Sequence, residues 1–168
     1  MKSRKELEFE RIYESHKDKI FRLCLGFSGD HSDDLFQEIL IKIWNNFEGF
    51  KGNSEISTWI YRIAFNTAIS FSAKEKKKSQ NQTGLTFQMD IPEAENNSND
   101  QEKQIQLLYQ AISELSEIDR IIATLLLENT PYKTIAEISG ITENYVAVKV
   151  NRIKTVLSQK LNPQIHGN

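Results

Sequence analysis

The stretch PYKTIAEISGITENYVAVKVNRIKTVLSQKL, residues 131–161, is the most informative part of the chain for predicting the fold. Apolar residues recur at helical spacing on both sides of Gly140, which predicts a short helix, a turn, and a longer helix capped by Thr142. Glycine suits the turn because it adopts positive φ without steric cost. Ala136 is small where the two helices would cross, and Val146 would pack back onto the first helix. The stretch therefore predicts a helix-turn-helix.

The second of these helices has a polar face opposite its buried one. Its apolar positions are spaced at i, +4, +7 and +11: Val146, Val150, Ile153 and Leu157. At 100° per residue, Asn144, Val148 and Asn151 point the other way, flanked by Tyr145, Lys149 and Arg152. Such a face fits the major groove of DNA, where these side chains can contact base edges and phosphates. An ordinary solvated helix in a bundle remains the alternative.

Helical periodicity continues through most of the chain. Three further runs have apolar stripes of the same kind: Leu35 to Phe47, Ile56 to Thr67, and Ile105 to Leu115. Ser32, Ser54, Ser116 and Thr130 precede helical runs and are predicted N-caps. We therefore expect an all-α fold with two small helical domains, residues 1–78 and 104–168, joined by a flexible acidic linker at 79–103.

The predicted linker, SQNQTGLTFQMDIPEAENNSNDQEK, is rich in polar and acidic residues and has no sustained apolar period. Such a segment cannot bury enough surface to offset the entropy lost on ordering. Its apolar residues alternate, which leaves a short strand-like docking segment as the alternative: Leu85, Phe87, Met89 and Ile91.

Charge is unevenly distributed along the 168 residues, whose net charge is only −2. Counted from the sequence, residues 1–78 carry 14 basic and 12 acidic residues, 79–103 carry one and five, and 104–168 carry six of each. The excess acidity therefore lies in the linker. A low net charge alone argues against strong unaided DNA binding.

Several classes of protein are disfavoured by composition. No apolar run approaches the roughly 20 residues of a membrane span, and the first 20 residues are too charged for a signal peptide. The single cysteine, Cys24, cannot form an internal disulfide, and the three histidines show no zinc-type spacing. We expect a cytoplasmic protein that requires no cofactor or metal and is not an enzyme.

Two segments of the first domain carry contrasting charge. In TWIYRIAFNTAISFSAKEKKK, residues 58–78, aromatic rings alternate with polar and basic groups, a combination that can stack on unpaired bases and neutralise phosphates. Trp59 belongs to the apolar stripe and is expected in the core. Tyr61, Arg62 and Asn66 lie off the stripe, so for them a role in binding bases and phosphates is the competing interpretation. Lys74 and the lysines after it would either contact phosphates or only solvate the end of the helix.

The acidic segment DHSDDLFQE, residues 30–38, admits three interpretations. Asp33 and Asp34 at a helix N-terminus are stabilised by the helix dipole, which suffices as a structural explanation. A carboxylate-based metal nuclease would also use such a cluster, but no second converging cluster is evident. The third interpretation is a protein-docking face formed by Asp34, Gln37, Glu38 and Lys42.

Together these segments resemble the extracytoplasmic-function (ECF) sigma factors of bacterial RNA polymerase. DDLFQEILIKIW is similar to the polymerase-binding helix of that family, TWIYRIAFNTAI to its promoter-melting helix, and residues 115–154 to its C-terminal promoter-reading domain. The resemblance covers roughly residues 6–76 and 104–161, in the same order.

The resemblance implies a role for each segment. The acidic helix would bind core polymerase through Asp34, Leu35, Gln37, Glu38 and Lys42. The downstream promoter element would be captured and melted by Tyr61, Arg62, Asn66 and Lys74, with the loop at 49–57. The upstream element would be read by Tyr132, Lys133, Asn144, Tyr145, Val148, Lys149 and Arg152. The resemblance also implies an anti-sigma factor as a partner protein. Departures such as Ala147 and Val148 in the recognition helix concern the promoter sequence, and their methyl groups could contact thymine.

The linker length permits a geometric test of this interpretation. Twenty-five residues form a coil of roughly 25–30 Å and reach about 80–90 Å when extended. Two DNA sites two helical turns apart are roughly 70 Å distant, so the linker would have to be stretched. A stand-alone helix-turn-helix regulator, acting without polymerase, is the alternative function.

Overall fold

The computed structural model describes residues 1–81 and 100–162. Over these residues the chain is helical, without strands, which confirms the predicted all-α class. The helices, with two short 3-10 turns (η), are α1 (Arg4–Ser28), η1 (Gly29–His31), α2 (Ser32–Asn46), η2 (Phe47–Gly49), α3 (Ile56–Asn81), α4 (Asp100–Ser113), α5 (Glu117–Leu127), α6 (Tyr132–Ser139) and α7 (Glu143–Leu161).

We call residues 1–81, which contain α1 to α3, the N-terminal half, and residues 100–162, which contain α4 to α7, the C-terminal half. Helix α3 ends at Asn81 and α4 begins at Asp100, so both extend into the segment predicted as a linker. The alternating residues Leu85, Phe87, Met89 and Ile91 lie outside the described residues. The division into two domains stays a prediction.

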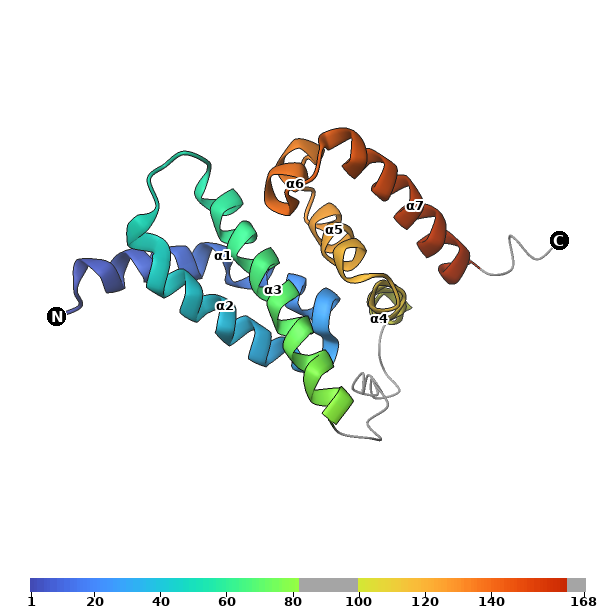
Figure 1. Ribbon diagram of the computed structural model, residues 1–168, viewed down its shortest axis with the longest axis horizontal. Helices are drawn as coiled ribbons and strands as arrows, with labels where there is room; N and C mark the ends of the chain where they lie inside the picture. Colours follow the sequence, from blue (N-terminus) through green and yellow to red (C-terminus); the bar gives the residue numbers. More distant parts are fainter. Residues whose placement is uncertain (82–99, 163–168) are drawn as a thin grey trace.

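The N-terminal half is a three-helix unit in which α2 and α3 pack on α1 and on each other (Figure 1). The predicted stripes form its core, because residues at helical spacing share one face. Leu35, Ile39 and Ile43 of α2 are fully buried against Ile60 and Ala64 of α3 in one apolar cluster. Trp59, predicted in the core, is only partly buried; it packs against this cluster, and its ring centroid lies 5.4 Å from that of Phe50.

The C-terminal half contains the predicted helix-turn-helix arrangement. Helix α6 ends at Gly140, whose φ of 72° is left-handed, and its N–H donates to the carbonyl of Ala136. Thr142 caps α7 by accepting a hydrogen bond from the backbone N–H of Tyr145. The predicted inward face of α7 is buried at Val146, Val150 and Ile153.

Of the other predicted caps, only Ser116 is confirmed; its side chain accepts from the N–H of Asp119. Ser32 is itself the first residue of α2 and is buried, because η1 continues directly into that helix. Ser54 lies two residues before α3 begins, and the N-cap of α6 is Pro131 instead of Thr130. Proline occupies that position because its fixed φ suits a helix start and it has no N–H to satisfy.

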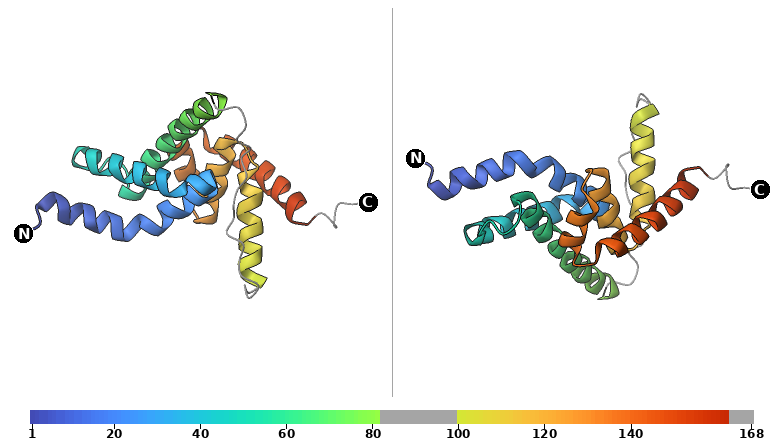
Figure 2. Two further views of the ribbon diagram at one scale, coloured as in Figure 1. Left: turned by 90° about the horizontal axis from the view of Figure 1, so that it is seen from below. Right: turned by 90° about the horizontal axis from the view of Figure 1, so that it is seen from above.

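The two halves pack directly against each other. Helix α1 contacts α4 and α5, and α3 contacts α5 and α6. Their apolar side chains join one core, in which Leu23 and Phe27 of α1 belong to the same cluster as Ile122 and Leu125 of α5. Figure 2 shows the first turns of α1 and the last turns of α7 at opposite ends of the molecule, with this contact between them.

Candidate functional site

The outer face of α2 carries the predicted polymerase-binding residues. Asp34 and Gln37 are exposed, and Glu38 is half-buried with its Oε1 3.2 Å from Nζ of Lys74 on α3. Ile41 lies on the same side of the helix, and its apolar side chain is 59% exposed. The face therefore combines carboxylate, amide and apolar groups.

Leu35 was predicted to lie on that face, but it lies on the opposite, buried side of α2. Leu35 is completely buried among the core residues of the N-terminal half, so its prediction as a polymerase-contacting residue is wrong for this structure. Leu35 belongs to the apolar stripe of α2. Core packing is therefore sufficient to explain a leucine directly after Asp34 in the motif.

A hollow of about 420 Å³ lies between the end of α2 and the middle of α3. Lys42 and Asn66 both line it, so the lysine predicted to face polymerase is instead placed beside the asparagine predicted to contact promoter DNA. Trp59 supplies an aromatic wall that the sequence interpretation assigned only to the core. The other lining residues are Asn46, Gly49, Ile63 and Thr67.

Tyr61 does not lie at the surface. It is 5% exposed, and its hydroxyl has no hydrogen-bond partner among the residues that the structure describes. Burial raises the pKa of Tyr61 to about 12, with a further contribution from the nearby carboxylate of Glu128. Tyr61 is therefore not accessible for base contact in this arrangement, although it lies off the apolar stripe of α3; it belongs to the apolar cluster that both halves share.

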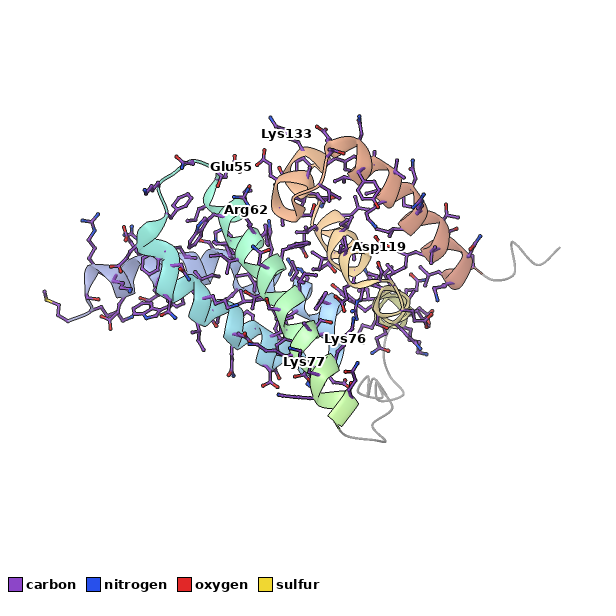
Figure 3. The ribbon with its side chains drawn as sticks, viewed as in Figure 1. Glu55, Arg62, Lys76, Lys77, Asp119 and Lys133 are labelled. Atoms are coloured by element: carbon purple, nitrogen blue, oxygen red, sulfur yellow. The ribbon has the colours of Figure 1, made fainter. Side chains whose placement is uncertain are left out.

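Arg62 keeps an exposed side chain, but it is directed to the C-terminal half. Its Nη2 donates to the main-chain carbonyl of Glu137 on α6 at 3.1 Å, and Nε lies 3.3 Å from the same oxygen. Figure 3 shows Arg62 on the side of α3 that faces α6, the helix that carries Lys133. Two predicted promoter-contacting surfaces thus meet across the contact between the halves.

Beside this contact lies a cleft of about 520 Å³, lined by residues of both halves. Lys19, Ser57 and Tyr61 line it from the N-terminal half, and Lys133 and Glu137 from the C-terminal half. Both basic and acidic residues line the cleft, so it has no single charge that would favour one class of ion.

The outward face of α7 agrees with the predicted one except at one residue. Asn144, Tyr145, Val148, Asn151 and Arg152 are exposed. The side chain of Lys149 is only 15% exposed, and its Nζ lies 2.8 Å from Oδ1 of Asp119 on α5. Lys149 thus joins two helices of its own half and is not displayed for DNA. The sequence could not show this, because its partner is 30 residues away. At the start of α6, Tyr132 packs partly against the core and Lys133 is exposed.

The acidic residues Asp33 and Asp34 were considered above as part of a metal-binding cluster. In residues 1–81 and 100–162, no three His, Cys, Asp or Glu side chains gather where they could hold a metal ion. Cys24 is completely buried, and burial raises the pKa of its thiol to about 12. A membrane span is equally absent from the described helices, none of which is long and apolar enough to form one.

Comparison with known proteins agrees with the motifs. Residues 12–78 match the sigma-70 region 2 family. The chain is 27% identical over 169 residues to the ECF RNA polymerase sigma-E factor of Haemophilus influenzae, covering 92% of this chain and 88% of the relative. It is 29% identical over 153 residues to the corresponding sigma-E factor of Escherichia coli K12, covering 82% and 77%.

Solved structures show the same fold. The sigma factor RpoE of Bartonella quintana, in complex with the anti-sigma factor NepR, matches with a TM-score of 0.77 at 22% identity, covering 94% of this chain and 98% of that one. CnrH, in complex with the cytosolic domain of CnrY, matches with a TM-score of 0.66 at 14% identity, covering 93% and 88%. Residues 12–78 thus match a sigma-70 region 2, and over most of its length the chain is similar to extracytoplasmic-function sigma factors of bacterial RNA polymerase, in agreement with the motif at Asp34–Glu38 on α2.

Proposed function

We propose that this sigma factor binds core RNA polymerase through the outer face of α2, captures an unpaired base of the downstream promoter element beside Asn66, and reads the upstream element with α7. It acts in the cytoplasm as the specificity subunit of an enzyme and performs no chemistry itself. The observation that carries the proposal is the placement, within one half, of an exposed acidic and apolar face and a separate polar hollow.

The α2 face has the composition of a protein-docking surface. Ile41 provides an exposed apolar anchor, and Asp34, Gln37 and Glu38 provide a polar surround. Interfaces commonly combine an apolar centre with a polar rim, and most of the binding energy comes from a few anchors. Because the surround is acidic, it favours a basic partner surface, and like-charged DNA phosphates are repelled from it.

The hollow beside Asn66 supplies the groups that hold an unpaired base. The ring of Trp59 offers a stacking surface, the amide of Asn66 can donate and accept hydrogen bonds at a base edge, and Lys42 can neutralise a phosphate. Taking a base out of a duplex costs a few kcal/mol, which contacts in the hollow would offset. Lys74 on the same helix as Asn66 is also exposed and would attract the phosphate backbone of the DNA.

Helix α7 supports recognition of the upstream element. Asn144 and Arg152 can form hydrogen bonds with base edges, and the exposed side chain of Val148 can contact a thymine methyl group. Lys133, exposed at the start of α6, would contact a phosphate, and the exposed ring of Tyr145, which lies 5.3 Å from Nζ of Lys149, would contact the DNA from α7. Lys149 is assigned instead to holding α7 against α5, through its ion pair with Asp119.

An anti-sigma factor is the proposed regulatory partner. The fold of this chain is shared over most of its length by RpoE, which is described in complex with the anti-sigma factor NepR, and by CnrH, which is described in complex with the cytosolic domain of CnrY. We propose that this chain is likewise held inactive by an anti-sigma protein.

A promoter-selection experiment tests the function. The chain, with purified core polymerase, is used to transcribe a template library randomised at both promoter elements. We expect enrichment of two short motifs at a fixed separation. Asn66→Ala should relax the downstream motif alone, and Asn144→Ala the upstream motif alone, so each variant is the control for the other. Selection of a single motif by the chain without polymerase would contradict the proposal and support a stand-alone regulator.

A further inference from the structure

The last residue of α2, Asn46, contributes a second amide to the hollow that Asn66 lines. Its Nδ2 donates a hydrogen bond to the main-chain carbonyl of Lys42, one turn earlier in the same helix, at 2.7 Å. Figure 1 shows the chain turning back beyond the end of α2 to begin α3, the helix that carries Asn66. The two amides therefore reach one hollow from two helices that pack on each other.

The bond to Lys42 determines which way the Asn46 amide is turned. A carbonyl oxygen can only accept a hydrogen bond, so the nitrogen of the amide, and not its oxygen, must face the Lys42 carbonyl. Oδ1 lies on the other branch of the same planar group, and it accepts no hydrogen bond from the described part of the chain. Because Asn46 is exposed, this oxygen is open to a ligand. Asn46 therefore offers the hollow a fixed acceptor.

The neighbouring groups of the hollow differ in what they offer. The exposed amide of Asn66 forms no hydrogen bond with the described residues, so it can turn to donate and accept. The buried hydroxyl of Thr67 already donates its proton to the carbonyl of Ile63 at 2.6 Å. A Cβ atom added at Gly49 would meet no atom within 4 Å, so this side of the hollow is open. A base entering there would meet one fixed acceptor and one adaptable amide.

The four bases differ in how well they match these two groups. Adenine and cytosine each carry an exocyclic amino group, with two N–H donors, beside a ring nitrogen that accepts. One N–H can be donated to Oδ1 of Asn46, while the Asn66 amide accepts the other and donates to the ring nitrogen. Thymine and guanine carry a carbonyl oxygen at the corresponding position. That oxygen would face Oδ1 of Asn46 with no proton between the two acceptors, which is unfavourable.

We propose that Asn46 is a specificity-determining residue of the hollow, and that its Oδ1 selects an unpaired base with an exocyclic amino group, adenine or cytosine. The inference rests on the proposed function, because it names the class of base that is captured beside Asn66. Stacking on Trp59 accepts all four bases, since each has a π-face. Selection among the bases therefore depends on the hydrogen bonds that the two amides form.

The test uses duplex templates that differ at one position, transcribed by core polymerase with this chain. The position is the one in the downstream motif whose selection Asn66→Ala relaxes. Adenine is compared with thymine, and cytosine with guanine, because each comparison only reverses one base pair and leaves its pairing strength unchanged. In wild type, the strand orientation that offers the amino-bearing base should initiate about tenfold faster in at least one comparison, and the reverse orientation should be favoured in neither.

Asn46→Ala should reduce that preference to about threefold or less, mainly by slowing initiation on the preferred base. Asn45→Ala is the matched control, because Asn45 is the preceding exposed asparagine of α2 and does not line the hollow. It should keep the wild-type preference. A wild-type preference for thymine or guanine would overturn the proposal, and so would a full preference for the amino-bearing base in N46A.

Asn46→Asp separates base selection from a structural role at the end of α2. Aspartate keeps the acceptor oxygen but has no N–H for the Lys42 carbonyl. N46D should therefore keep the preference ratio, while its negative charge slows initiation on all templates alike. If Asn46 only stabilises the helix end, N46D should lose the preference as N46A does, which would contradict selection by Oδ1.

Removing the amino group from the DNA gives a second readout. With purine in place of adenine, or pyrimidin-2-one in place of cytosine, wild type should lose more of its initiation rate than N46A, which has already lost one of the two contacts. Equal losses in both proteins would overturn the inference. Failure of the proposed function has a different signature, because Asn66→Ala would then relax no position, or wild type would give no promoter-specific start sites with core polymerase.

Discussion

Nζ of Lys74 on α3 lies 3.2 Å from Oε1 of Glu38 on α2, so a cation proposed to attract promoter DNA contacts a carboxylate proposed to bind polymerase. The side chains are 63% and 28% exposed, respectively. An ion pair this open contributes between about zero and 1 kcal/mol to stability. Its two members are therefore available to other partners at small cost to the fold.

Polymerase binding should depend on the acidic end of α2. Asp34→Lys reverses an exposed charge on the docking face and should weaken core-polymerase binding at least tenfold, measured by fluorescence anisotropy, with the helical circular dichroism unchanged. Asp33→Lys, the neighbouring exposed residue about 100° around the helix, is the control and should have a smaller effect. Equal affinity for D34K and wild type would remove this face from the interface.

Two apolar residues of α2 should behave oppositely. Leu35→Ala removes a fully buried side chain and should lower the free energy of unfolding by about 2–5 kcal/mol in a urea titration. Ile41→Ala should change it by less than about 0.5 kcal/mol, because Ile41 is largely exposed. Polymerase affinity should fall in I41A all the same. A stable I41A variant with undiminished affinity would show that Ile41 is not an anchor.

Arg152 and Lys149 should also separate in their effects. Arg152→Ala should weaken binding to the upstream element by about 1–3 kcal/mol if its guanidinium contacts a base. The measurement compares cognate with scrambled upstream DNA, using chain bound to core polymerase. Equal losses on both DNAs would identify a phosphate contact. Lys149→Ala should instead lower the melting temperature, because it leaves Asp119 of α5 without its ion-pair partner.

Alkaline pH should weaken the fold through Tyr61. Its folded pKa is raised from the ordinary 10.0 to about 12, so the unfolded chain loses this proton first as the pH rises. The contribution is fully present below pH 10 and is lost toward pH 12, with a slope of at most about 1.4 kcal/mol per pH unit. Urea titrations of Tyr61→Phe between pH 9 and 11 should show a shallower fall than wild type. Identical slopes would contradict burial of this hydroxyl.

Local sequence signals were sufficient for much of the fold. The stripes of α2, α3 and α7 predicted which residues face the core, and Gly140 and Thr142 marked the turn and the cap because each acts within one helical turn. Capping predictions were wrong at Ser32 and Thr130, where a 3-10 turn and Pro131 determine the helix starts. The 3-10 turn and Pro131 are also local features. The spacing of apolar residues does not show which of several neighbouring residues begins the helix.

The sites were harder to predict because their accessibility depends on contacts between distant segments. Tyr61 is buried although it lies off the apolar stripe of its helix, and the contact of Gly26 with Thr124 joins residues almost 100 positions apart. Lys42 could have been grouped with Asn66 only after α2 and α3 had been placed side by side. Periodicity predicts which side of its helix a side chain lies on. It does not predict which residue of another helix contacts that side chain.

The most direct measurement is transcription from a linear template by purified core polymerase, with and without this chain, beside a band shift on the same DNA without polymerase. We predict discrete start sites only when both chain and core are present, and no sequence-specific shift by the chain alone. Tight specific binding by the chain alone, with no start sites in the presence of core, would contradict its action as the promoter-specificity subunit.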